Sequence, residues 1–464
     1  MDTPVKTAAK ETPQESAVVA TEIHDTTDFA QLPSMLFRSL AAVILGTLVL
    51  RLASQTMGQM LQYYLAEIDR NYYAISYTTR GLIIAAFFIP ELFGSPLLGA
   101  MSDRYGRKLF ILLGPILGGI AVLITSATTA IWLLVFTRLL EGLSTASSVP
   151  ATLGYISEVT KGRPKMRARV IGLFEITLVG GIAIGAIVGG YLWKFFGSPN
   201  TFLGISLISP AFALNAIIYL LSLAIFWWGI SEAKKHEQTL HLTDEHGSWK
   251  RFAAVLRAPQ VWRFVPAWLG INSIIGAWLN TANGLMTGKD HFANQLLTGN
   301  VSSERFGNGF AILAIIFAGG VLVWSFVLGS YRRTSVMLLA TIGLFATMLS
   351  VYGLNHLSSF DSPLHYPLLA ALLISVVVLS AFTPAALTYL ADVTESKTED
   401  RGSIMGLYSV FLGVGQLIGT TSGGFFASLA GIDGLVLLSS IFGVITAFTL
   451  LALRKQEPQF KPQV

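Results

Sequence analysis

The sequence predicts an all-α membrane protein of twelve transmembrane helices, arranged as two pseudo-symmetric six-helix bundles. Only 12% of its 464 residues are charged and 53% are hydrophobic, whereas a soluble domain carries about 25% charged residues. Mean hydropathy is +0.63. Apolar stretches of about 20 residues, each long enough to span a bilayer as a helix, recur along the chain. A repeat relates the two halves, as described below.

The predicted membrane helices fall into two sets of six. They cover residues 36–66, 77–101, 108–128, 131–157, 167–193 and 203–230, then 261–287, 307–330, 334–355, 365–391, 403–429 and 434–453. We expect bundles at 35–230 and 261–454, joined by a cytoplasmic linker at 231–260. Polar composition predicts a disordered cytoplasmic tail at 1–34 and a second tail at 455–464. Lys and Arg gather in alternate turns, which predicts cytoplasmic N- and C-termini.

Composition also limits the function classes. The chain has no cysteine, which excludes disulfides, thiolate metal sites and a cysteine nucleophile. Its seven histidines fall in predicted tails, loops and helix ends, so we expect no intramembrane histidine relay. The net charge of +5 is explained by the basic turns, so no nucleic-acid partner is expected. We expect no metal, no cofactor and no enzymatic activity, because no P-loop and no cluster of catalytic side chains is evident. The missing signal peptide and cysteine favour a bacterial inner membrane.

An internal repeat supports the division into halves. PATLGY at 150–155 matches PAALTY at 384–389, a spacing of 234 residues. The same spacing, without a gap, aligns several glycines, namely Gly172 with Gly406, Gly181 with Gly415, Gly185 with Gly419, and Gly189 and Gly190 with Gly423 and Gly424. Helices 4–5 therefore correspond to helices 10–11, as in transporters with two duplicated halves.

The turn between helices 2 and 3 carries the most specific motif. Residues 99–108 read GAMSDRYGRK, and this pattern resembles the equivalent loop of the major facilitator superfamily, a family of secondary transporters. The resemblance covers about residues 36–453. It implies a gating role for this turn, with Asp103 facing the start of helix 11 near Ser403, where the positive helix end favours an anion. The motif residues are Gly99, Asp103, Arg104, Gly106, Arg107 and Lys108. The alternative is simple anchoring of the turn at the membrane surface.

Two further patterns resemble motifs of proton-linked drug and solute exporters in that family. Arg138-Leu-Leu-Glu141-Gly142 resembles its R-x-x-x-G motif, which implies proton coupling; the alternative is a static pair of Arg138 with Glu141. The glycines of helix 5 resemble the antiporter motif, with Ala186 in place of its proline. Because helix 11 repeats these glycines, part of the pattern is also explained by symmetric helix packing.

A polar stripe predicts the substrate site. Arg51, Gln55, Gln59 and Gln62 share one face of helix 1. Asn272, Asn280 and Asn283 repeat the pattern in helix 7, and Gln416 adds a neutral polar contact from helix 11. Polar stripes in membrane helices face the bundle interior or a water-filled cavity. The alternative is hydrogen bonding that only holds helices together.

Glu91 is the predicted proton-coupling acid, with Glu141 and Glu175 as alternatives. Counted from the cytoplasmic ends of their helices, Arg51 and Glu91 lie about 22 Å and 18 Å deep, which allows them to pair. The alternative is a permanent ion pair. Arg51 favours an anionic or zwitterionic substrate, unless Glu91 neutralises the charge of Arg51. Two more pairs, Glu158 with Arg167 and Asp392 with Arg401, are predicted to clasp matching cytoplasmic corners.

These observations predict a proton-coupled secondary transporter that moves a small organic solute or drug by alternating access, by export through antiport. The alternatives are a proton symporter for uptake and a flippase for a lipid or lipid-linked sugar. The expected partners are the small-molecule substrate, protons and the lipid bilayer, and the expected functional unit is a monomer.

Overall fold

The computed structural model describes residues 34–161, 163–202, 205–231, 259–288, 292–328, 331–394 and 401–455. The predicted N-terminal tail lies outside these residues except for Ser34. The predicted linker and C-terminal tail lie outside them except at their edges.

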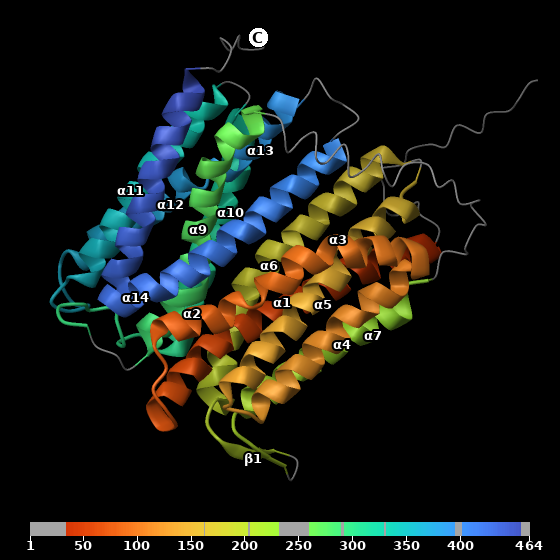
Figure 1. The fold of residues 1–464 in the computed structure, drawn as a ribbon, viewed down its shortest axis with the longest axis horizontal. Helices are drawn as coiled ribbons and strands as arrows, with labels where there is room; N and C mark the ends of the chain where they lie inside the picture. Colours follow the sequence, from red (N-terminus) through yellow and green to blue (C-terminus); the bar gives the residue numbers. More distant parts are fainter. Residues whose placement is uncertain are drawn as a thin grey trace, which may run out of the picture.

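The N-terminal half is a bundle of helices, most of them long (Figure 1). Its helices are α1 (Ser34–Asn71), α2 (Tyr77–Ala85), α3 (Phe88–Tyr105), α4 (Arg107–Ser126), α5 (Ile131–Val159), α6 (Pro164–Phe196) and α7 (Pro210–Gly229). The buried face of α1 contributes Met57, Met60, Leu61 and Tyr64 to the largest apolar cluster of this half. This half therefore has a core of its own, as expected for a separate bundle.

The C-terminal half is a second bundle of helices (Figure 1). Its helices are α9 (Pro259–Thr287), α10 (Ser303–Val327), α11 (Arg333–Asn355), α12 (His365–Leu379), α13 (Phe382–Thr394) and α14 (Arg401–Arg454). Non-helical backbone at Ala430 and Gly431 divides α14 into two membrane helices. Gly431 has a φ of +59°, a left-handed conformation that favours glycine.

The twelve predicted membrane helices are confirmed. In the described part of the chain, nine helical segments are long and apolar enough to cross a membrane, with α2–α3, α12–α13 and α14 each counted as one segment. The turn at Ala430 and Gly431 divides α14 into two membrane helices, which raises the count to ten. The remaining two are α5 and α9, which have 29 residues each and are long enough to span a bilayer although they are more polar.

Two predicted helices, the second and the tenth, are interrupted, and proline explains both interruptions. The break between α2 and α3 lies at Ala86 and Phe87, and the break between α12 and α13 lies at Ser380 and Ala381. Pro90 and Pro384 follow the first residue of each break by four positions. A proline has no N–H to donate to the carbonyl four residues earlier, so the helix is weakened there.

The predicted start of helix 6 at residue 203 is wrong. The helix begins at Pro210, and the preceding residues form a hairpin in which β1 (Asn200–Phe202) pairs antiparallel with β2 (Ile205–Leu207). Proline fits the first turn of a helix because its fixed φ and missing N–H cost nothing there. Apolar composition alone did not separate this short hairpin from the helix that follows.

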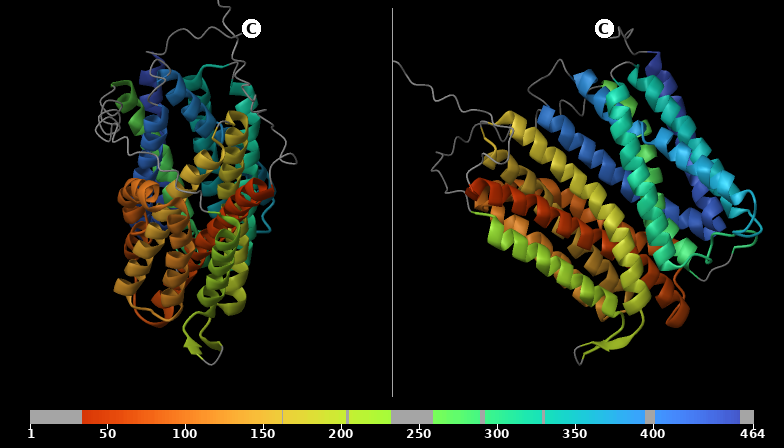
Figure 2. Two further views of the ribbon diagram at one scale, coloured as in Figure 1. Left: turned by 90° about the vertical axis from the view of Figure 1, so that its right-hand side faces the viewer. Right: turned by 180° about the vertical axis from the view of Figure 1, so that it is seen from behind.

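The two bundles meet at one end of the molecule. We call the end with the α3–α4 turn, Arg333 and Arg454 the basic end, and the opposite end, with the C-terminus of α1 and the β1–β2 hairpin, the loop end. Figure 2 (right) shows the bundles converging toward the loop end and running apart toward the basic end. The hydrogen bonds that join the bundles within the described residues all lie near the loop end.

Candidate functional site

Five charged side chains from four helices interact within the N-terminal bundle. They are Arg51 of α1, Glu91 of α3, Arg138 and Glu141 of α5, and Glu175 of α6. Glu91 and Glu175 act electrostatically on Arg51, and Arg51 and Arg138 act on Glu91. Such charges inside a membrane bundle are costly unless they are paired or hydrated. We call these five residues the charge cluster.

Arg138 and Glu141 form the closed part of the charge cluster. They are ion-paired one helical turn apart, and only 5% and 1% of their surfaces are exposed. The hydroxyl of Tyr219 from α7 donates a second hydrogen bond to Glu141, at 3.3 Å. The guanidinium of Arg138 also lies over the ring of Phe87, 4.8 Å from its centroid. Both charges are therefore paired within the bundle, while the buried Nε of Arg138 has no hydrogen-bond partner among the described residues.

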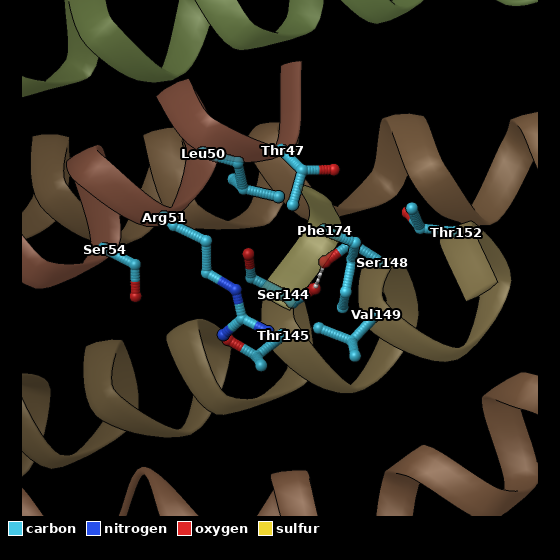
Figure 3. A pocket seen from close by; sticks show the side chains of 10 residues that line it. All are labelled: Thr47, Leu50, Arg51, Ser54, Ser144, Thr145, Ser148, Val149, Thr152 and Phe174. Atoms are coloured by element: carbon cyan, nitrogen blue, oxygen red, sulfur yellow. Dashed lines mark hydrogen bonds between the residues drawn. The ribbon is translucent and has the colours of Figure 1, made fainter. Parts of the chain in front are cut away.

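Arg51 forms the open part of the cluster, in a small polar cavity between α1, α5 and α6 (Figure 3). Six hydroxyl side chains contribute to its lining, namely Thr47, Ser54, Ser144, Thr145, Ser148 and Thr152. The guanidinium of Arg51 points toward Thr145 (Figure 3). The buried hydroxyl of Thr47 has no hydrogen-bond partner among the described residues. The sequence signal for this cavity is the run of hydroxyls at 144–148 within an apolar helix, which the sequence analysis missed.

Glu91 and Glu175 are the two acids of the charge cluster whose carboxylates have no partner among the described residues. No hydrogen bond or ion pair from a described residue reaches either carboxylate. Glu91 is half-buried and follows the break between α2 and α3, whereas Glu175 is exposed on α6. The structure therefore brings the predicted Arg51 and Glu91 together, and it adds Glu175 to them.

Three of the predicted substrate residues join the two bundles. The amide of Asn283 on α9 donates to the side chain and the backbone carbonyl of Gln59 on α1, at 2.8 Å and 3.0 Å. The amide of Gln62 donates to the carbonyl of Leu279 at 3.1 Å and accepts from the backbone N–H of Gly284 at 3.1 Å. All three side chains are buried. In this conformation they hold the bundles together near the loop end.

The other predicted substrate residues lie along α1, α9 and α14. Gln55 packs against Gly185 of α6, and Asn272 packs against Gly415 of α14. Asn280 donates to Thr420 of α14 at 3.0 Å. Gln416 is half-buried, and its backbone lies against Gly276. These residues connect helices within each half. None of them lines the cavity around Arg51.

A second set of bundle contacts escaped the sequence analysis because no motif marks it. Lys194 of α6 is ion-paired with Glu304 of α10 at 3.0 Å. Tyr63 donates to the carbonyl of Ser303 at 3.2 Å, and the hydroxyl of Ser303 donates to the carbonyl of Gly190 at 3.0 Å. A Cβ on Gly190 would lie 2.6 Å from the Ser303 oxygen. Glycine is therefore required at this close contact between α6 and α10.

The motif turn is organised by Arg107. This guanidinium is ion-paired with Asp103 and with Glu158, and it donates to Ser102 at 2.9 Å. Gly106, with a φ of +107°, separates α3 from α4, and Gly99 packs against Pro150. Arg104 lies over Tyr105 and Lys108 over Trp227.

The predicted clasp between Glu158 and Arg167 is not formed. Glu158 is bound 2.9 Å from Arg107 instead, while Arg167 donates to Thr160 and to the carbonyl of Ser157. Arg107 of α4 lies closer to Glu158 of α5 than Arg167 does, because α4 and α5 pack along their length. The predicted pair of Asp392 with Arg401 and the approach of Asp103 to Ser403 fall on side chains outside the described residues.

Comparison with known proteins identifies the family. The family model of the Major Facilitator Superfamily matches residues 29–299 and 291–464, two matches that together cover nearly the whole chain. The chain belongs to the major facilitator superfamily. It is therefore a membrane transporter of this superfamily, and its relatives and structural neighbours are transporters rather than enzymes.

Relatives of this transporter include drug-resistance proteins. It is 24% identical to Multidrug resistance protein 1 of Bacillus subtilis, over 75% of this chain and 81% of that protein. It is 28% identical to Tetracycline resistance protein, class C, of Escherichia coli, over 57% of this chain and 68% of that protein. The crystal structure of the nucleoside transporter NupG superposes with a TM-score of 0.68 at 14% identity, over 90% of this chain and all of that one. This likeness establishes a shared fold.

Proposed function

We propose that this transporter exports a small organic molecule that carries a cationic group, in exchange for protons. The basic end faces the cytoplasm, and transport proceeds by rocking of the two bundles about a site that includes the charge cluster. Glu91 is the acid that alternates between the proton and the substrate. The positive-inside rule supports the orientation, because the Arg and Lys side chains of the turns gather at the basic end.

The observation that carries this proposal is the charge balance of the cluster. Three carboxylates, Glu91, Glu141 and Glu175, face two guanidiniums, Arg51 and Arg138. Arg138 and Glu141 neutralise each other, so Arg51 has two acids near it and can balance one of them. The remaining negative charge is costly at membrane depth. A proton or a cationic substrate group can neutralise it, and the two compete, which is the requirement for exchange.

The same balance explains why the substrate is proposed to carry a cation. Arg51 taken by itself favours an anionic group. With Glu91 and Glu175 both acting on Arg51, its charge is already matched, and the excess charge of the cluster is negative. The drug-resistance names of two relatives support export of organic compounds.

The bundle contacts at the loop end support the alternating-access part of the proposal. With the basic end in the cytoplasm, Gln59, Gln62 and Asn283 close the route to the outside. Opening that route requires these hydrogen bonds and the Lys194–Glu304 pair to break. Such a closed end on one side is the arrangement expected of an inward-facing state.

Proton flux in everted vesicles tests the proposal. Vesicles with an established pH gradient are given a panel of amines, acids and neutral compounds, and a pH-sensitive dye reports the gradient. We expect amines to dissipate the gradient with the wild-type protein and not with Glu91→Gln. Glu67→Gln is the matched control, because Glu67 is a carboxylate of α1 that pairs with Arg70 at the loop end, outside the cluster.

The remaining outcomes distinguish the alternatives. A full response with Glu91→Gln would move the coupling role to another acid of the cluster. Dissipation by acids alone would contradict the cationic substrate. Proton entry coupled to solute uptake in right-side-out vesicles would indicate symport, and movement of labelled lipid without proton flux would indicate a flippase.

A further inference from the structure

Two cation–aromatic pairs lie side by side where α7 ends. The guanidinium of Arg38, from α1, is 4.1 Å from the ring centroid of Trp228. The ammonium of Lys108, from α4, is 5.6 Å from the ring centroid of Trp227. The two tryptophans are neighbours in sequence, so cations from two different helices flank one aromatic pair. We call Arg38, Lys108, Trp227 and Trp228 the tryptophan corner.

The tryptophan corner faces away from the protein. Trp227 and Trp228 are 68% and 72% exposed. Toward the middle of α7, Ile217, Leu220 and Leu221 are also exposed, so this face of the helix is apolar along much of its length. Helix α7 has 20 residues and is about 30 Å long, the thickness of the hydrocarbon core. Its end therefore lies at the level of the lipid headgroups, where tryptophan is enriched.

Within the described residues, the two cations of the tryptophan corner have no carboxylate partner. Arg38 donates one hydrogen bond to the carbonyl of Trp228, which fixes the guanidinium and leaves its other N–H donors available. The neighbouring cation Arg107 differs, because it has two carboxylate partners. Unbalanced cations at the headgroup level attract anionic lipids.

We propose that the tryptophan corner binds the headgroup of an anionic phospholipid. The lipid phosphate lies between Arg38 and Lys108, which donate hydrogen bonds to it, and the glycerol and upper acyl chain lie against the two indole rings. Arginine and lysine are both suited to phosphate, arginine through its several planar donors. The bound lipid connects the ends of α1, α4 and α7, which belong to one bundle, so the site does not depend on the rocking motion.

Lipid counting by native mass spectrometry tests this site on the full-length protein. The purified protein is equilibrated in micelles with equal amounts of phosphatidylglycerol and phosphatidylcholine, and bound lipids are counted. We expect the wild type to retain phosphatidylglycerol preferentially. Arg38→Gln with Lys108→Gln should lower that preference at least fivefold and leave phosphatidylcholine binding unchanged. Arg70→Gln with Lys194→Gln, which removes two cations at the loop end, is the matched control and should keep the preference.

Two more variants separate charge from folding. Arg38→Lys with Lys108→Arg keeps both charges and should retain the preference for phosphatidylglycerol. Trp227→Leu with Trp228→Leu keeps the cations and should weaken binding of both lipids. Equal retention of the two lipids by the wild type would overturn the proposal, as would an unchanged preference in the double glutamine variant. Because lipid binding is read directly, failure of this site and failure of proton exchange are distinguishable.

Discussion

Gln59 of α1 and Asn283 of α9 are hydrogen-bonded to each other across the two bundles, by two bonds from one amide. Both side chains are almost fully buried, and they occupy corresponding first helices of the two halves. A polar pair placed there stabilises the closed loop end, because separation of the bundles leaves both amides without their partner.

Asn283→Ala should therefore shift the protein toward opening at the loop end. Interhelical hydrogen bonds in membranes contribute about 0.6 kcal/mol each, so the loss of two predicts about a sevenfold change in the ratio of open to closed protein. Spin labels on Tyr72→Cys and Asp361→Cys, in loops of the two bundles, measure this by pulsed electron resonance. The chain has no native cysteine, so labelling is specific.

Asn300→Ala is the control for this measurement, because the side-chain hydrogen bonds of Asn300 to described residues stay within its own loop. An unchanged distance distribution in Asn283→Ala would show that this pair does not stabilise the closed end.

Charge reversal should test the Lys194–Glu304 pair. Lys194→Glu or Glu304→Lys alone places like charges across α6 and α10 and favours opening of the loop end. The pair is partly exposed, so each effect should be about twofold to fivefold and should weaken in high salt. The double reversal restores the attraction and should return the spin-label distances to the wild-type distribution; non-restoration would contradict a pairwise role.

The buried pair of Arg138 and Glu141 should show strongly non-additive stability effects. Removal of one partner leaves a charge unpaired in the bundle, with an expected loss of about 3–5 kcal/mol in the free energy of unfolding. Arg138→Met together with Glu141→Met should cost less than the sum of the two single changes. Reversible unfolding in mixed micelles measures this. Tyr219→Phe, which removes one hydrogen bond, should cost about 1 kcal/mol. Additive losses would rule out the coupling.

Two glycines of α6 should respond oppositely to alanine. A Cβ on Gly185 would lie 2.6 Å from Cβ of Gln55, whereas a Cβ on Gly172 has no neighbour within 4 Å. Gly185→Ala should destabilise by about 1–3 kcal/mol because α1 and α6 are forced apart. Gly172→Ala should be neutral or stabilise by up to about 1 kcal/mol, since alanine favours helix. The same unfolding assay applies; equal effects would show that close packing is unimportant here.

The repeat in the sequence and the packing of the two halves agree in detail. Gly181 and Gly185 of α6 contact α1 at Arg51 and Gln55, and their counterparts Gly415 and Gly419 of α14 contact α9 at Asn272 and Ser273. The glycine pattern that resembles an antiporter motif is thus also a packing device used in both halves. It was predictable because a spacing of small residues along one helix face is a local property of the sequence.

The sequence by itself determined the number and order of the membrane helices and the two halves, and it predicted the depth of Arg51 and Glu91. These follow from hydropathy and from a helical rise that is the same in every helix. Only the tertiary structure decided which charged and polar side chains are partners. Arg107 rather than Arg167 binds Glu158, Glu175 joins Arg51, and Asn283 meets Gln59. Those choices depend on how closely helices approach and how they are rotated, which is set by side chains from several distant segments at once.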